Sequence, residues 1–93
     1  MKTVVLYQLK EDNPNFNKNY DSNTFDMRQY EIVFEGERGD LYSPTNAYYE
    51  FNNKFPTECT GRKIEVSDVI GIGENVFYHN TNSWIKLKEE DYV

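Results

Sequence analysis

The helical segment between two prolines is the feature of this sequence that most restricts the fold. Ser43 followed by Pro44 is typical of a helix start, because the serine side chain accepts hydrogen bonds from first-turn amides and proline has no amide to leave unpaired. Pro56 lacks the amide hydrogen that a continuing helix needs. The sequence therefore predicts one helix over residues 44–55. Apolar residues at three- and four-residue spacing predict a buried stripe of Ala47, Tyr48, Phe51 and Phe55, and a solvated side of Asn46, Glu50, Asn53 and Lys54.

The rest of the chain has the periodicity of strands separated by turns. β-branched and aromatic residues predict a strand at 3–9, and alternation predicts another at 30–35. Gly- and Asn-rich turns separate three further strands of an antiparallel meander, at 63–72, 76–78 and 84–88. One helix packed on one face of a mostly antiparallel sheet of about five strands is an α+β fold.

A polar segment separates the first two predicted strands. Residues 10–23 contain five Asn and one Pro, which compete with regular structure, so they predict a loop. Loops of this length are often functional or mobile. A short helical turn is predicted after it, at 24–28. The 93 residues are expected to form a single domain, because two halves would each be too small to bury a core.

Residues that commonly carry catalysis or bind metals are scarce. The chain has one cysteine, Cys59, and one histidine, His79, which we interpret as a half-buried thiol and an exposed residue beside a turn. Gly71 and Gly73 are interpreted as part of a hairpin turn, because no helix follows them to bind a phosphate. We therefore expect a protein that is not an enzyme and carries no metal or cofactor. A single cysteine and the lack of a membrane-spanning apolar run lead us to expect a cytoplasmic protein without membrane contact.

Negative charge is the most informative feature of the composition. The formal net charge is −6, which disfavours direct nucleic-acid binding. The candidate partner-binding acids are Asp26, Glu31, Glu35, Glu37 and Asp40. Alternation predicts that Glu31 and Glu35 lie on one face of a strand, about 13 Å apart. Such a row can take the place of phosphates in a basic groove, or it can be a solvated face that blocks edge pairing.

Three tyrosines are candidate aromatic contacts for a partner. Tyr42, Tyr49 and Tyr92 have the side chain that anchors many protein interfaces, although core packing explains each of them equally well. A sheet this small also allows two copies of the chain to pair through an edge strand as a homodimer.

Three short motifs resemble the YodL-like domain family. They are Tyr7-Gln8 at the end of the first strand, Phe51-Asn52 before Pro56, and Val66-Ser67-Asp68-Val69. The resemblance implies a small domain of the kind found in Firmicutes, their mobile elements and their phages, and it carries over no catalytic residue. From the residues themselves, we expect the side chain of Ser67 or Asp68 to bond to the backbone and to bend the strand before Val69.

Two functional hypotheses follow from the charge and the resemblance. The first is an acidic, non-enzymatic phage or mobile-element protein that binds and inhibits a host defence nuclease of the CRISPR or restriction type by nucleic-acid mimicry. The alternative is an adaptor or regulator that binds another host protein through aromatic or edge-strand contacts, without mimicry.

Overall fold

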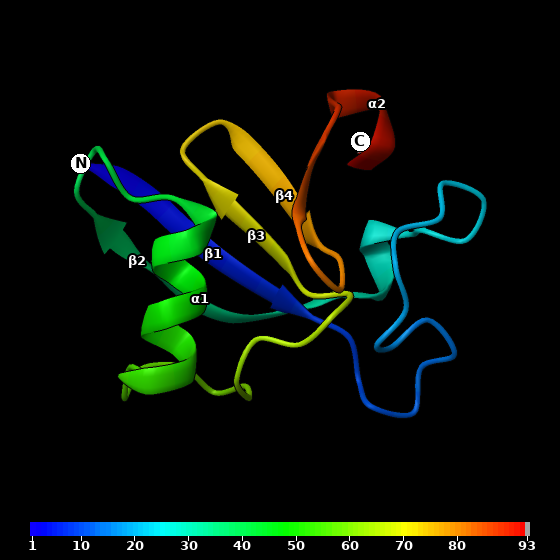
Figure 1. The fold of residues 1–93 in the computed structure, drawn as a ribbon, viewed down its shortest axis with the longest axis horizontal. Coiled ribbons are helices and arrows are strands. Elements are labelled where there is room, and N and C mark those ends of the chain that lie inside the picture. The colour runs from blue at the N-terminus through cyan, green and yellow to red at the C-terminus, as the bar shows by residue number, and fades with distance from the viewer. Residues whose placement is uncertain (93) are drawn as a thin grey trace.

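The computed structural model describes residues 1–92 and shows a five-stranded sheet with one main helix (Figure 1). The strand order is β2-β1-β3-β4-β5, and every neighbouring pair is antiparallel. The strands are β1 (Lys2–Gln8), β2 (Glu31–Arg38), β3 (Val69–Ile72), β4 (Asn75–His79) and β5 (Trp84–Leu87). The helices are α1 (Pro44–Asn53), the 3₁₀ helix η1 (Met27–Gln29) and α2 (Glu89–Tyr92). The predicted α+β fold is therefore confirmed.

Helix α1 begins where the sequence predicts and ends two residues earlier. Ser43 and Asn46 cap each other reciprocally: the Asn46 amide donates to Ser43 Oγ at 3.3 Å, and the Ser43 amide donates to Asn46 Oδ1 at 2.9 Å. Phe51 is fully buried, but Tyr48 is 43 % exposed and Phe55 is 37 % exposed. The predicted buried stripe is thus wrong at both positions, because Tyr48 lies on the flank of the helix and Phe55 lies beyond its last turn.

The main core lies between α1 and one face of the sheet, which we call the inner face. Val4 and Leu6 of β1 and Ile70 of the central strand β3 are fully buried there. Phe51 of α1 meets Phe34 of β2 edge-to-face, with 5.1 Å between the ring centroids. The apolar residues of α1 and of alternate strand positions thus account for this half of the fold.

The outer face of the sheet has a second apolar cluster. Val69 and Tyr78 are buried there, and three aromatic residues pack against them: Tyr20 from the predicted loop, Phe25 from the segment after it, and Tyr92 from α2. Figure 1 shows the 10–30 segment and α2 on the side of the sheet away from α1. The loop was predicted, but its role as a cover for the sheet was not, and α2 was missed because four residues carry little periodicity.

A β-bulge in β2 changes which side chains share a face. Leu6 pairs with Phe34 and Tyr7 pairs with Ile32, so Val33 is an extra residue without a partner in β1. Because side chains alternate along a strand, one extra residue reverses the faces on its two sides. The simple alternation predicted over 30–35 is therefore wrong.

Candidate functional site

The predicted acidic row is divided by this bulge. Glu31 pairs with Gln8, whose side chain points to the inner face, whereas Glu35 pairs with Val5 and Glu37 with Thr3 on the outer face. The prediction that Glu31 and Glu35 share a face is thus wrong. Glu35 and Glu37 do share one, about 7 Å apart at two strand positions, and both are exposed.

The other predicted acids are bound within the chain. Asp26 accepts hydrogen bonds from the Arg28 amide and guanidinium at 3.0 Å, and these bonds lower the pKa of Asp26. Asp40 lies 2.9 Å from the amino group of Met1, and Glu31 lies 3.7 Å from Lys10 Nζ. Of the five predicted acids, Glu35 and Glu37 are the two that form no ion pair within residues 1–92.

The three predicted aromatic contacts differ in exposure. Tyr49 on α1 is 57 % exposed, with Lys54 Nζ 5.8 Å from its ring centroid. Tyr42 is half-buried and donates a hydrogen bond to Glu50 Oε1 at 2.6 Å, and Tyr92 packs on the outer cluster. Of these three tyrosines, only Tyr49 therefore has an exposed ring.

A polar triad joins β2 to α1. Arg38 Nε donates to Glu50 Oε1 at 3.1 Å, and Tyr42 donates to the same oxygen. The hydrogen bond from Arg38 lowers the pKa of Glu50, while burial raises the pKa of Tyr42. The prediction that Glu50 faces water is wrong. Its side of α1 lies against β2, where the Glu50 carboxylate forms an ion pair with Arg38.

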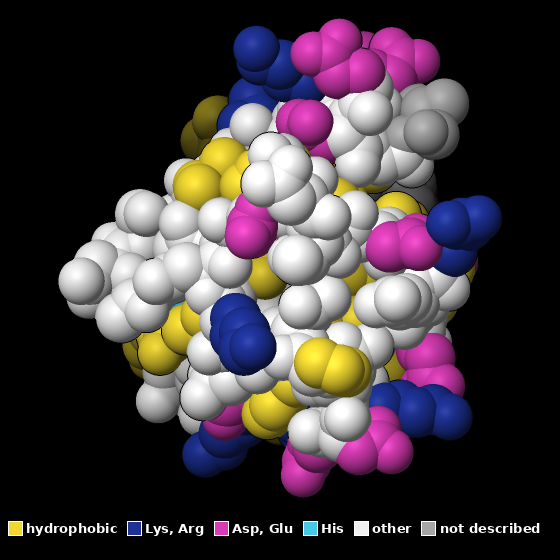
Figure 2. Space-filling model, turned by 90° about the vertical axis from the view of Figure 1, so that its right-hand side faces the viewer, with side chains coloured by type: hydrophobic (Ala, Val, Ile, Leu, Met, Phe, Trp, Pro, Cys, Tyr) yellow, Lys and Arg dark blue, Asp and Glu magenta, His cyan; other side chains and the backbone are white. Residues whose placement is uncertain are grey.

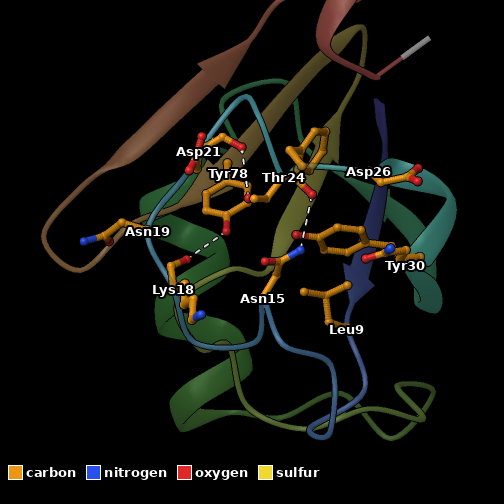
Figure 3. A pocket seen from close by; sticks show the side chains of 11 residues that line it. Leu9, Asn15, Lys18, Asn19, Asp21, Thr24, Asp26, Tyr30 and Tyr78 are labelled. Carbon is orange, nitrogen blue, oxygen red and sulfur yellow. Dashed lines mark hydrogen bonds between the residues drawn. The ribbon is translucent and has the colours of Figure 1, made fainter.

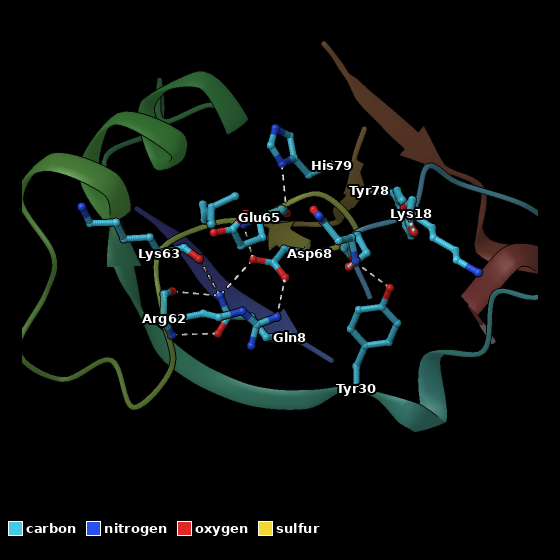
Figure 4. Close-up of polar contacts among 12 residues, drawn as sticks. Gln8, Lys18, Tyr30, Arg62, Lys63, Glu65, Asp68, Tyr78 and His79 are labelled. Atoms are coloured by element: carbon cyan, nitrogen blue, oxygen red, sulfur yellow. Dashed lines mark hydrogen bonds and ion pairs between the residues drawn. The ribbon is translucent and has the colours of Figure 1, made fainter. Parts of the chain in front are cut away.

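Asp68 is a charged residue that is 0 % exposed (Figure 4). Its Oδ2 accepts from Gln8 Nε2 at 2.9 Å and from the Glu65 amide at 2.8 Å, and its Oδ1 lies 3.4 Å from Arg62 Nη2. Burial raises the pKa of Asp68 to about 7, against the opposing effect of these hydrogen bonds.

His79 belongs to the same network. Its Nδ1 lies 3.0 Å from the Glu65 carbonyl oxygen, which can only accept, so Nδ1 carries the proton. The His79 amide donates to the Asp68 carbonyl at 2.8 Å. The prediction that His79 is exposed is wrong: it is buried at the junction of β4 with the 61–68 segment.

This network explains why β3 is shorter than predicted. Ser67 has a φ of 86°, and Asp68 accepts from the Glu65 amide, so the chain turns before Val69 enters the sheet. The predicted bend at Ser67 and Asp68 is confirmed. The predicted strand over 63–72 keeps only its last four residues.

Side chains from distant elements satisfy the backbone of the 61–68 segment. Gln8 Nε2 donates to the Arg62 carbonyl at 2.9 Å, and Gln8 Oε1 accepts from the Arg62 amide at 3.0 Å. Asn52 Oδ1 accepts from the Ile64 amide at 2.8 Å. Gly61 approaches so closely that a Cβ atom there would collide with Gln8. These side chains have a structural role. They supply the hydrogen bonds that a neighbouring strand would otherwise make to the backbone of residues 61–68, because buried backbone groups need partners.

Two surface hollows were not predicted from sequence. One lies between α1 and the β4–β5 hairpin, where the His79 ring is 5.2 Å from Tyr48 and 4.5 Å from Trp84. The other is a cavity of about 170 Å³ between the 15–30 segment and the outer face (Figure 3). Its lining is Leu9, Asn15, Lys18, Asn19, Asp21, Thr24, Phe25, Asp26, Gln29, Tyr30 and Tyr78.

Charges of both signs are mixed on the end of the molecule that carries the 10–30 segment and α2. Figure 2 shows acidic and basic side chains interspersed there, with small apolar areas between them. Among residues 1–92, no three His, Cys, Asp or Glu side chains are placed to hold a metal ion. The same residues include no helix with the length and apolar character to cross a membrane.

The polar residues of the three motifs have a common location in the structure. Gln8, Asn52, Ser67 and Asp68 all hold the 61–68 segment in place, and the YodL-like domain family matches residues 3–86. The chain belongs to the YodL-like domain family. No curated protein and no solved structure gives a significant match to it. The polar residues that mark this YodL-like chain therefore help to shape its fold.

Proposed function

We propose that this YodL-like protein is a non-enzymatic phage or mobile-element protein that inhibits a host nucleic-acid-handling protein, such as a CRISPR or restriction nuclease. It does so by placing acidic side chains on the basic surface where that protein holds its nucleic acid. The observation that supports this is the pair Glu35 and Glu37, two exposed carboxylates on one face of an edge strand that have no partner among residues 1–92.

An apolar residue lies on the same face of β2. Ile32 pairs with Tyr7 on the outer face and is 57 % exposed. A surface that combines a large aliphatic side chain with two glutamates can exclude water at its centre and steer a basic partner at its rim. This outer edge of β2, made of Ile32, Glu35 and Glu37, is the surface we assign to the partner.

The bulge provides a matched control for this assignment. Glu31 is on the same strand with the same charge, but it belongs to the opposite face. We expect Glu35→Lys with Glu37→Lys to slow association with the nuclease about tenfold or more at low salt, whereas Glu31→Lys changes it less than about twofold.

The experiment begins with tagged protein exposed to host lysate, followed by purification of the captured nuclease. Association rates and cleavage inhibition are then measured for the three proteins at several salt concentrations. Mimicry predicts that rising salt weakens inhibition. If the variant with Glu35→Lys and Glu37→Lys still inhibits cleavage, and high salt does not weaken inhibition, the two glutamates have no role.

The adaptor hypothesis has its own supporting observation. Tyr48 and Tyr49 are both exposed on α1, and Tyr48 borders the hollow that Trp84 lines. Exposed tyrosine and tryptophan are typical of interface anchors. Tyr48→Ala with Tyr49→Ala leaves the charge unchanged, so a loss of partner binding in this variant alone would favour an adaptor without mimicry.

A further inference from the structure

Three aromatic rings converge on the cavity under the 15–30 segment. Phe25 lies 5.8 Å from Tyr78 and 5.7 Å from Tyr30, measured between ring centroids. In Figure 3 the two tyrosines stand on opposite sides of the cavity, with Leu9 below them. The volume of about 170 Å³ is close to the roughly 150 Å³ of an engineered cavity that holds benzene. The space therefore fits a compact group.

The hydroxyl groups of the two tyrosines have already donated their hydrogens. Tyr30 donates to the Ser67 carbonyl at 2.7 Å, and Tyr78 donates to the Lys18 carbonyl at 2.8 Å. Burial raises the pKa of both phenols, so both stay protonated near neutral pH. Each hydroxyl can therefore only accept a further hydrogen bond.

The two acidic residues that line the cavity differ in whether their carboxylate oxygens are free to contact a ligand. Asp26 is bound to Arg28, but Asp21 uses only Oδ1, which accepts from the Asn23 amide at 2.9 Å. The second oxygen of the Asp21 carboxylate is left for a ligand. Lys18 is the one basic side chain in the lining. Aromatic rings, hydroxyl oxygens with a partial negative charge and an available carboxylate together favour a cation.

We propose that this cavity binds the head group of a compact organic cation, of about the size of a trimethylammonium group. The cation is held between the rings of Phe25, Tyr30 and Tyr78, with Asp21 at the rim. The head group belongs either to a free small molecule or to a modified lysine side chain of a protein. This site is separate from Glu35 and Glu37, so it does not depend on the nuclease proposal.

The test is a titration of the ¹⁵N-labelled full chain followed by NMR. Choline is the cationic probe, and 3,3-dimethyl-1-butanol is its neutral isostere. We expect choline to shift the amides of residues 21–30 in a saturable way, and the alcohol to do so at least tenfold more weakly. Equal binding of the two would show a merely apolar cavity, and the absence of saturation by choline would show no site; either result overturns the proposal.

Charge variants on the exposed rim separate the cation site from general packing. Asp21→Asn keeps an oxygen for the Asn23 amide and should weaken choline binding about threefold, while Lys18→Gln should tighten it about threefold at low salt. Phe25→Leu should weaken it about tenfold, with the amide spectrum of β1 and β3 as the check on folding. No response to either charge variant would contradict the assignment.

The source of the cation is resolved with a second probe, a blocked trimethyllysine with acetylated and amidated ends. Saturable binding of choline alone supports a free small cation, because the backbone of the blocked residue is then excluded. Binding of both supports a protein side chain as the ligand. Failure of both probes overturns the proposal while leaving the role of Glu35 and Glu37 open to its own experiment.

Discussion

Replacing Asp68 by Asn should remove a pH dependence that runs opposite to ordinary acid denaturation. The Asp68 carboxyl is 0 % exposed, and burial raises its pKa from 3.8 to about 7. Asparagine keeps one oxygen where Gln8 Nε2 and the Glu65 amide both donate to Oδ2, at 2.9 and 2.8 Å. The variant therefore resembles the protonated native state without a titratable group.

The sign follows from proton binding in the two states. Between pH 3.8 and about 7, native Asp68 holds a proton that the unfolded chain has lost, so stability falls as pH rises. A difference of about three pKa units at about 1.4 kcal/mol each gives a change on the order of 4 kcal/mol. Relative to Asp68→Asn, the wild-type protein should lose up to this amount of unfolding free energy between pH 4 and pH 8.

The assay is urea unfolding of both proteins at several pH values, followed by the fluorescence of Trp84, the only tryptophan and a half-buried one. Subtracting the two curves cancels the other titrating groups. The ¹³C shift of the Asp68 carboxyl gives an independent titration in the wild-type chain. The reasoning is refuted if the wild-type protein gains stability relative to Asp68→Asn as pH rises, because the hydrogen bonds would then outweigh burial.

Further substitutions test the packing and the polar triad by the same urea assay. Phe51→Ala should lower the unfolding free energy by about 3–5 kcal/mol, whereas Phe55→Ala, outside the helix and partly exposed, should lower it by less than about 1 kcal/mol; similar losses would mean that both rings are core. Gly61→Ala should cost about 2 kcal/mol or more because the new methyl group has no room, and an unchanged midpoint would contradict the close approach. Glu50→Gln should cost about 1–2 kcal/mol at pH 7; since Arg38 lowers the pKa of Glu50, this loss should shrink as pH falls through the lowered value, and a constant loss would exclude the ion pair as its cause.

The sequence alone determined the elements whose signals are local. Ser43 and Pro44 define the start of α1 because capping involves residues within one turn. The β-branched and aromatic segments predicted the strands, and their number and turns predicted an antiparallel sheet with one helix. The bend at Ser67 and Asp68 was also predictable, since its hydrogen bond spans three residues.

Only the tertiary structure decided which side chains share a face of the sheet and which are buried. The extra residue Val33 becomes apparent only when β2 pairs with β1, and it moves Glu31 away from Glu35. The burial of Asp68 depends on Gln8, 60 positions earlier, and the cavity forms only when the 15–30 segment covers Tyr78. Register and burial depend on contacts between residues far apart in the chain, and a local pattern contains no information about such contacts.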